Sequence, residues 1–592
     1  MRLIASWFRQ GWAGCRNWLR WHRWTFWLIL AIASLTLTLA IALLPSLATS
    51  TPRPKVILIS ADSMNPTQVD QYIRQGILST DRGVGLLRRL GVSAKQNTTI
   101  IPSLTAPSHI AIGTGSIASR NDINANSFHL VASPFNANIS GFGAPIGGYT
   151  LGNGNVAESA EPTAEPLWIA LRNSGKRVVA ATFPGADGVD VRVPGLTGSP
   201  VVQSSQRRTV DFTVPFGAFG GAGAQGFSLT AADFTAAPDA LVEQLSAVGR
   251  RSFSPVLQRT TPETLTIGGV SYTIQAAVLD SSDDSQTNYD TISFYDVAQG
   301  IQPGPFTLPS TGPAFIKAGD RISKLFFFEG SPTKAGTSFY LTQLAPDLST
   351  VRFTRYSANF IPSTPVVQAD VDAINSSVGF WAPQPDFRIP ERLSPGFTNF
   401  SDAELEAIYE DQVNSFTDYQ TRLVLEAIRR NPEADLVLTY FEQPDGSGHQ
   451  FTLTDPRQAT DFTNPNSIGE GQDRDKVARY QRYVARAYQV TDRAIQRIIQ
   501  EVGTDRRGRP LSNIILVSDH GMAPFHTAVN LNAFLQSQGF DATKVRAVTS
   551  GPAANVYINL QGREANGTVT PEEYVTLQEQ LVKALSSLQD TN

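Results

Sequence analysis

Cysteine is nearly absent from this sequence. Its single cysteine, Cys15, has no partner in the chain, so no intrachain disulfide can stabilise the fold. A charge excess is lacking as well, because 48 Lys and Arg residues oppose 52 Asp and Glu residues, for a net charge of -4. Nucleic-acid binding requires a basic surface, which this balance does not indicate. Stability must come from apolar burial, and 592 residues suffice for roughly two or three domains.

Acidic residues are missing from the first 45 positions. Residues 1–23 combine arginines with tryptophans, and residues 25–44 carry no charge over a length that can span a bilayer. Arginines before such a stretch predict a cytoplasmic basic, Trp-rich segment over residues 1–23 and a transmembrane anchor over residues 24–45. The alternative is a signal peptide cleaved after residue 48, which would release a secreted protein. Both interpretations place the remainder outside the cytoplasm, in the periplasm or the extracellular space.

Three apolar segments each lead into an aspartate. They are residues 55–62 (KVILISAD), 435–445 (DLVLTYFEQPD) and 513–520 (NIILVSDH). Apolar runs without alternation predict strands buried on both faces of a parallel sheet. Helices are predicted between the strands, over residues 165–174, 401–430 and 473–502, the second opening with the capping-box pattern SDAE. We therefore expect an α/β fold with a mostly parallel central sheet flanked by helices, whose strand ends deliver the three acids to one edge.

A different texture separates two parts of this α/β frame. Residues 196–397 are rich in Phe, Gly, Ser and Thr, in alternating pieces such as SYTIQAAVL and TSFYLTQL that are bounded by turn residues. This pattern predicts a β-rich insert that caps the frame. The catalytic α/β domain would then consist of residues 54–195 and 398–592.

Hydroxyl and amide side chains cluster between the first and second strands. The segment PSLTAPSH offers Ser103, Thr105 and Ser108, and SRNDINANSFH follows with Asn121, Asn124 and Asn126. A hydroxyl nucleophile needs a general base or a metal ion to activate it. No GxSxG motif is present, and only six histidines are available. Aspartates grouped with histidines favour divalent metal ions, of which zinc is the usual occupant of mixed Asp/His sites.

The order of these motifs is informative. ISAD, PSLTAPSH, Asn126, PDGSGH and SDHGM follow one another in a way that resembles the alkaline phosphatase superfamily, and within it the nucleotide pyrophosphatase/phosphodiesterase branch. The likeness covers residues 55–194 and 401–560. It implies an alkaline phosphatase-like fold, two zinc ions per chain and hydrolysis of a small phosphate ester by a two-metal in-line displacement.

The resemblance also implies a role for each motif residue. One zinc ion would be held by Asp62, Asp519 and His520, with Thr105 as its hydroxyl ligand and as the nucleophile that becomes phosphorylated. The second zinc ion would be held by Asp445 and His449, with the glycines between them letting the backbone wrap closely around the ion. Asn126 would donate to a non-bridging phosphoryl oxygen. His109 is expected to hydrogen-bond its turn, and His129 to serve in packing.

The chain departs from the pattern of that branch at several positions. Ser63 replaces the usual glycine after the first aspartate, and Ala106 replaces the aromatic residue that stacks on a nucleobase. No histidine follows His526, although the second zinc ion of the family takes a late histidine. Either His526 supplies that ligand or the natural chain continues past Asn592, and we expect the catalytic domain to be incomplete at its C-terminus.

Two other functions are open at this point. A phosphonate or phosphomonoester hydrolase of the same superfamily would use the same residues. A membrane-anchored binding protein with a decayed site would keep the fold and bind at most one metal ion. A sulfatase is disfavoured, because the only cysteine lies in CRNWL and no C/S-x-P-x-R motif surrounds it.

Overall fold

The computed structural model describes residues 52–95, 97–147, 164–217, 219–301, 313–321, 324–328, 334–452, 474–524 and 528–589. The predicted anchor at residues 24–45 lies outside these residues, and so does His526. Among the helices of the described residues, none is both long and apolar enough to cross a membrane.

A five-stranded parallel sheet forms the centre of the fold. Its strands lie in the order β21-β1-β20-β4-β7, and every neighbouring pair is parallel. Their bounds are Val56–Ala61 for β1, Val178–Ala181 for β4, Phe212–Val214 for β7, Leu436–Phe441 for β20 and Asn513–Val517 for β21. The three apolar segments of the sequence are thus β1, β20 and β21, side by side. The prediction of a parallel α/β frame is confirmed.

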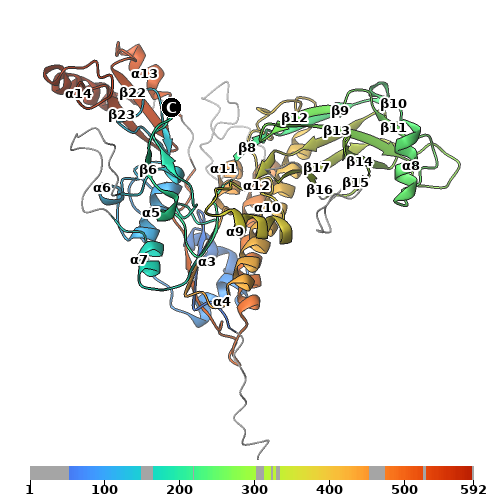
Figure 1. Cartoon of the computed structure of the whole chain (residues 1–592), viewed down its shortest axis with the longest axis horizontal. Helices are drawn as coiled ribbons and strands as arrows, with labels where there is room; N and C mark the ends of the chain where they lie inside the picture. The colour runs from blue at the N-terminus through green and yellow to red at the C-terminus, as the bar shows by residue number, and fades with distance from the viewer. Residues whose placement is uncertain are drawn as a thin grey trace, which may run out of the picture. The chain divides into compact units, whose positions relative to one another are not determined.

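Successive residues of each inner strand pack into different cores. In β1, Ile57 and Ile59 belong to one buried cluster, whereas Leu58 between them belongs to the cluster on the opposite face. Helices α10 and α12 supply the first cluster, and α5 and α7 supply the second (Figure 1). Burial on both faces is the reason that these strands carry apolar residues without alternation.

The helices of the frame begin where the sequence provides caps. In α10, the Ser401 hydroxyl accepts from the backbone N–H of Glu404, and the Glu404 carboxylate accepts from the backbone N–H of Ser401. This is the capping box predicted from SDAE. The helix bounds are Pro66–Arg74 for α3, Gly83–Leu90 for α4, Thr105–Thr114 for α5, Ala118–Asn121 for α6, Leu167–Asn173 for α7, Gln368–Ser377 for α9, Asp402–Arg430 for α10, Asp445–Phe451 for α11 and Arg474–Val502 for α12.

Two antiparallel sheets fill most of the stretch predicted as a β-rich insert. The first contains β10 (Phe234–Ala236), β11 (Leu257–Arg259), β12 (Glu263–Ile267), β13 (Val270–Leu279), β14 (Thr291–Asp296) and β15 (Ala314–Lys317). The second contains β8 (Phe219–Ala222), β9 (Gln225–Leu229), β16 (Lys324–Phe328), β17 (Ala335–Leu344), β18 (Val351–Arg355) and β19 (Ala358–Phe360). Both sheets contribute to one apolar cluster, in which the rings of Phe294 and Phe339 stack 4.0 Å apart.

The ends of the predicted insert behave differently from its middle. Strand β7 lies within residues 196–397 but pairs with β4 in the central parallel sheet. Val367, just before α9, and Val371 within it belong to the same buried cluster as the frame helices α10 and α12. The antiparallel sheets therefore occupy a narrower range than the change in composition indicates.

A small C-terminal lobe follows the last strand of the parallel sheet. It consists of α13 (Leu531–Ser537), β22 (Val545–Ser550), β23 (Ala553–Ile558) and α14 (Pro571–Ser586). Strands β22 and β23 form an antiparallel pair, and Leu581 of α14 packs on it with Val545 and Ile558. This pair covers the apolar face of α14. The lobe also contacts β2 (Ser127–Phe128), which pairs with β3 (Ile139–Ser140) just after Asn126.

Candidate metal and catalytic site

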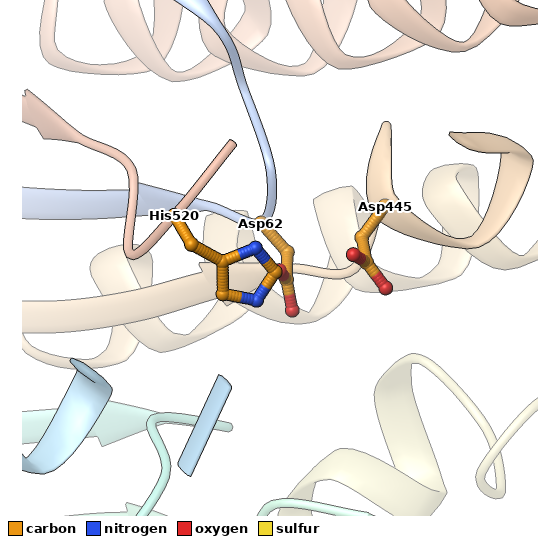
Figure 2. A group of neighbouring side chains, drawn as sticks. All are labelled: Asp62, Asp445 and His520. Carbon is orange, nitrogen blue, oxygen red and sulfur yellow. The ribbon is translucent and has the colours of Figure 1, made fainter. Parts of the chain in front are cut away.

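Three neighbouring strands bring the predicted ligands to one edge of the sheet. Ala61 of β1 is in register with Phe441 of β20, and Ser60 of β1 is in register with Val517 of β21. The residues that follow these strands include Asp62, Asp445 and His520, whose potential ligand atoms all lie within 4.8 Å of one another. Figure 2 shows the two carboxylates and the imidazole facing a common space from three separate elements. The structure thus brings Asp62, Asp445 and His520 together at this edge of the sheet.

The more enclosed part of the site is built around His520. Its Nε2 atom lies 3.2 Å from Thr105 Oγ1, 3.3 Å from Asp519 Oδ2 and 3.5 Å from Asp62 Oδ1. Ligands about 2.0–2.1 Å from a tetrahedral zinc ion are about 3.3–3.4 Å from one another. We call these four residues the buried half of the site. Its spacing fits a tetrahedral ion.

The proton of His520 is held on the side away from this cluster. Its Nδ1 atom lies 2.9 Å from the carbonyl oxygen of Gly521, which can only accept a hydrogen bond. Nδ1 therefore carries the proton, and Nε2 presents a lone pair toward Asp62, Asp519 and Thr105. A metal-binding histidine is usually oriented by such a bond from its other nitrogen.

Each carboxylate of the buried half has one oxygen without a hydrogen-bond partner in the described part of the chain, and a bound cation could serve as that partner. Asp62 Oδ1 and Asp519 Oδ2 are buried, and neither accepts a hydrogen bond from the described residues. Asp62 Oδ2 accepts from the Tyr440 hydroxyl at 2.7 Å. Burial, and then the charges of Asp445 and Asp519, raise the pKa of Asp62 well above its usual value. Buried oxygens without partners, in a set of hard and borderline donors, fit a divalent ion.

Asp519 differs from Asp62 in its electrostatic surroundings. Burial by itself would raise the pKa of Asp519, but the pKa is lowered to about 2, and the largest opposing influence is the imidazole of His109, whose Nδ1 lies 3.3 Å from Asp519 Oδ2. Its Oδ1 atom also accepts from the backbone N–H of Ser63 at 3.2 Å. The surroundings of the two carboxylates therefore act in opposite directions, lowering the pKa of Asp519 and raising that of Asp62.

Thr105 is the only predicted hydroxyl that contacts a ligand among the described residues. It begins helix α5, whose N-terminal end favours a bound anion through the helix dipole. Ser103 is exposed, and Ser108 is buried with its hydroxyl 3.3 Å from that of Thr99. Of the three candidate hydroxyl groups, only that of Thr105 is in a position to act at this site.

Asn126 is the asparagine that bonds the residue next to Thr105. Its carboxamide oxygen accepts from the backbone N–H of Ala106 at 2.8 Å, so its NH2 group remains as a donor. The hydroxyl of Ser550, in the C-terminal lobe, accepts from the backbone N–H of Asn126. Asn121 instead bonds its own turn, and Asn124 bonds Asn555.

The second part of the site is more open. Asp445 Oδ2 lies 3.4 Å from His449 Nε2, which again fits two ligands of one tetrahedral ion. The side chain of Asp445 is 13% exposed and that of His449 is 64% exposed. We call this pair the open half of the site.

The chain between Asp445 and His449 is helical, which corrects the expectation of a loop that wraps around the ion. These residues start α11, so their i, i+4 spacing places both side chains on one helix face. The two glycines have another cause. A Cβ on Gly446 would lie 2.1 Å from the Glu442 carboxylate, and a Cβ on Gly448 would lie 2.9 Å from the Met522 side chain. A larger residue at either position would therefore require the Glu442 or the Met522 side chain to move.

The two remaining described histidines serve as hydrogen-bonding residues. His109 Nδ1 lies 2.7 Å from the Thr105 carbonyl oxygen and His109 Nε2 lies 2.8 Å from Ser60 Oγ, which supports the predicted role in the turn. His129 was expected only to pack. Its Nε2 atom lies 2.8 Å from Glu564 Oε2, so it joins the loop after Asn126 to the C-terminal lobe.

Sequence reasoning missed three residues that support the ligands. Tyr440 bonds Asp62, Ser550 bonds Asn126, and Ser63 bonds Asp445 through its hydroxyl at 2.9 Å. Tyr440 and Ser550 lie in ordinary strand sequences and gave no signal. Ser63 gave a signal, because it stands where glycine is usual, but its contacts required the fold.

Comparison with known proteins identifies the chain at the level of the family. The sequence model described as type I phosphodiesterase / nucleotide pyrophosphatase matches residues 56–220 and 339–592. The chain belongs to this family. No curated protein and no solved structure gives a match. As a type I phosphodiesterase / nucleotide pyrophosphatase, the protein is a member of a metal-dependent hydrolase family, and the Asp62, Asp445 and His520 group is a possible metal site.

Proposed function

We propose that this protein is a two-zinc phosphodiesterase that cleaves a small phosphate ester with Thr105 as its nucleophile. The carrying observation is the geometry around His520, where three oxygens lie 3.2–3.5 Å from Nε2. Thr105 Oγ1 is one of these oxygens, so the hydroxyl sits within the ligand set. A hydroxyl in that position is the natural candidate for activation by a bound metal ion.

Asp62, Asp519, His520 and Thr105 would hold one zinc ion, and Asp445 with His449 would hold the other. When bound, zinc ions lower the pKa of a coordinated hydroxyl and neutralise charge on phosphoryl oxygens. The protein contributes the remaining groups. Thr105 would attack phosphorus while the bond to one alcohol of the diester breaks and that alcohol leaves. Water would then hydrolyse the bond between Thr105 and phosphorus, which releases a phosphate monoester that keeps the second ester group.

The residues around Thr105 favour binding of the phosphoryl group. The N-terminal end of α5 favours negative charge through the helix dipole, and the Asn126 NH2 group is a donor within reach of the same region. Ala106 leaves no aromatic surface beside the nucleophile, so nothing at that position selects a nucleobase. We therefore propose a phosphate diester substrate without specifying its leaving group, acted on outside the cytoplasm.

The proposal is tested with the full chain, purified in detergent and supplied with zinc. Turnover of bis(p-nitrophenyl) phosphate should exceed that of p-nitrophenyl phosphate and of a phenylphosphonate ester. The protein should also retain about two zinc ions per chain. Preference for the monoester or the phosphonate would reassign the substrate class. No turnover together with one zinc ion or none would overturn the enzyme assignment in favour of a binding protein.

A further inference from the structure

Ser63 occupies a backbone conformation that suits glycine. Its φ angle is 56°, in the left-handed region that residues with a Cβ atom rarely adopt. The residue is buried, with 2% of its surface exposed. A glycine would take this conformation without strain. The presence of a serine here therefore points to a use for its hydroxyl group.

The Ser63 hydroxyl contacts both halves of the site. Its Oγ atom lies 2.9 Å from Asp445 Oδ1 in the open half and 3.0 Å from His520 Nδ1 in the buried half. It also lies 3.1 Å from the carbonyl oxygen of Gly521. The hydroxyl has one proton to give, and the carboxylate is the stronger acceptor at the shorter distance. Ser63 therefore donates to Asp445.

His520 does not depend on Ser63 in the same way. Its Nδ1–H has the Gly521 carbonyl oxygen as an acceptor at 2.9 Å. Removal of the hydroxyl would leave that bond in place. Asp445 has no such substitute, because the hydrogen bond from Ser63 is the only one that its side chain receives among the described residues.

We infer that Ser63 is a positioning residue, which holds the Asp445 carboxylate so that its second oxygen faces His449. With Oδ1 engaged by Ser63, Oδ2 is the atom 3.4 Å from His449 Nε2. This role rests on the proposed two-zinc function. It compensates for an open half in which the described residues supply only Asp445 and His449, because a fixed ligand loses less conformational entropy on binding.

The expected effect is confined to the open half. Replacing a residue that orients a metal ligand weakens metal affinity by about 10–100-fold. Ser63→Gly removes the hydroxyl and relieves the backbone strain, whereas Ser63→Ala removes the hydroxyl and keeps the strain. Both variants should bind the first zinc equivalent like the wild type and the second one about 10–100-fold more weakly.

Ser518→Ala is the matched control. Ser518 immediately precedes Asp519 in the chain. Its hydroxyl donates to the backbone carbonyl of His520 and not to the side chain of a proposed metal ligand. It should leave both zinc affinities within about threefold of the wild type.

Zinc titration of the metal-free full chain, followed by competition with a chelator, measures the two affinities. Two wild-type equivalents with selective weakening of the second in both Ser63 variants support the inference. Unchanged affinities in Ser63→Gly would overturn it while the proposed function stands. If the wild type bound fewer than two ions, the proposed function and this inference would both fail.

A double-mutant cycle gives a readout without metal. The unfolding equilibrium of the metal-free chain is measured for the wild type, Ser63→Ala, Asp445→Ala and the double variant. A hydrogen bond to the Asp445 carboxylate predicts a coupling of roughly tenfold or more in the unfolding constant. Additive effects of the two substitutions would show that Ser63 does not hold Asp445 and would refute the inference.

Discussion

The two halves of the proposed metal site differ in how much of the fold holds them. In the buried half, Asp62 and Asp519 are almost fully covered, and the lone pair of His520 is directed inward by a backbone carbonyl. In the open half, His449 is 64% exposed and lies on a single helix. The first half is preorganised by two strand ends and the start of α5, whereas the second half depends on α11 and on Ser63.

This contrast suggests a division of labour within one site. A preorganised set of ligands binds metal tightly because little entropy remains to be lost. An exposed set leaves room for water and for substrate, as catalytic zinc sites require. We expect the buried half to carry the nucleophile and the open half to receive the substrate. Substitutions in and near both halves can break or sharpen this comparison.

The largest effect is expected for Thr105, because it is the proposed nucleophile and one of the four residues of the buried half. Thr105→Ala should lower turnover of a diester by at least about three orders of magnitude, and Thr105→Ser should retain measurable activity. The measurement is kcat with saturating zinc, together with trapping of a labelled phosphoenzyme. Ser103→Ala is the matched control, since Ser103 is exposed on the preceding turn. Loss of activity in Ser103→Ala with an active Thr105→Ala protein would reverse the assignment.

The next effect compares one ligand from each half. Asp62→Asn should remove the tightly held zinc ion and lower kcat by about 1,000-fold, because the buried carboxylate has no substitute. His449→Ala should remove only the weakly held ion and lower kcat by about 10–100-fold. Added zinc or imidazole should restore part of the activity of His449→Ala, since that position is open to solvent.

Zinc content after dialysis and kcat with added zinc measure this difference. The Asp62→Asn protein should retain at most one zinc ion, bound weakly, and the His449→Ala protein should retain one ion bound tightly. Equal losses of metal from both variants would contradict the division into a tight half and an exchangeable half. In that case the two ions would bind as one cooperative unit.

The sequence was sufficient to predict the frame that carries both halves. Uninterrupted apolar runs ending at Asp62, near Asp445 and at Asp519 predicted neighbouring parallel strands, since parallel strands place their carboxyl ends at one edge. Two features escaped prediction for a physical reason. One is the helical form of α11, and the other is the close approach of the Glu442 and Met522 side chains to Gly446 and Gly448, which only the folded chain shows.

Strand β7 escaped prediction for a different reason. Phe212–Val214 spans only three residues within a Gly- and Phe-rich stretch, and a run that short has no readable period. Its place in the central sheet follows from pairing with β4 and not from its own composition. The hydroxyl of Ser63 is a similar case, because its partners lie more than 380 residues away in the sequence.

The smallest effect on the comparison is expected from Glu442, which precedes α11 in the chain and lies close to the open half. Glu442 lies against Gly446 of α11, and burial, and then the charge of Asp445, raise its pKa from 4.5 to about 8. Between these values the folded chain binds a proton that the unfolded chain releases. Stability of the metal-free protein should therefore fall as the pH rises from about 4.5 to about 8, by less than about 1.4 kcal/mol per pH unit.

Glu442→Gln should remove this slope, because glutamine keeps the size of the side chain and has no proton to lose. Urea unfolding of the metal-free protein at several pH values between 5 and 8 is the measurement, with exposed Glu433→Gln as the control. The wild type and Glu433→Gln should lose stability in parallel, while Glu442→Gln should lose less. Parallel curves for all three proteins would contradict this prediction, because they would mean that Glu442 is already ionised in the folded chain at these pH values.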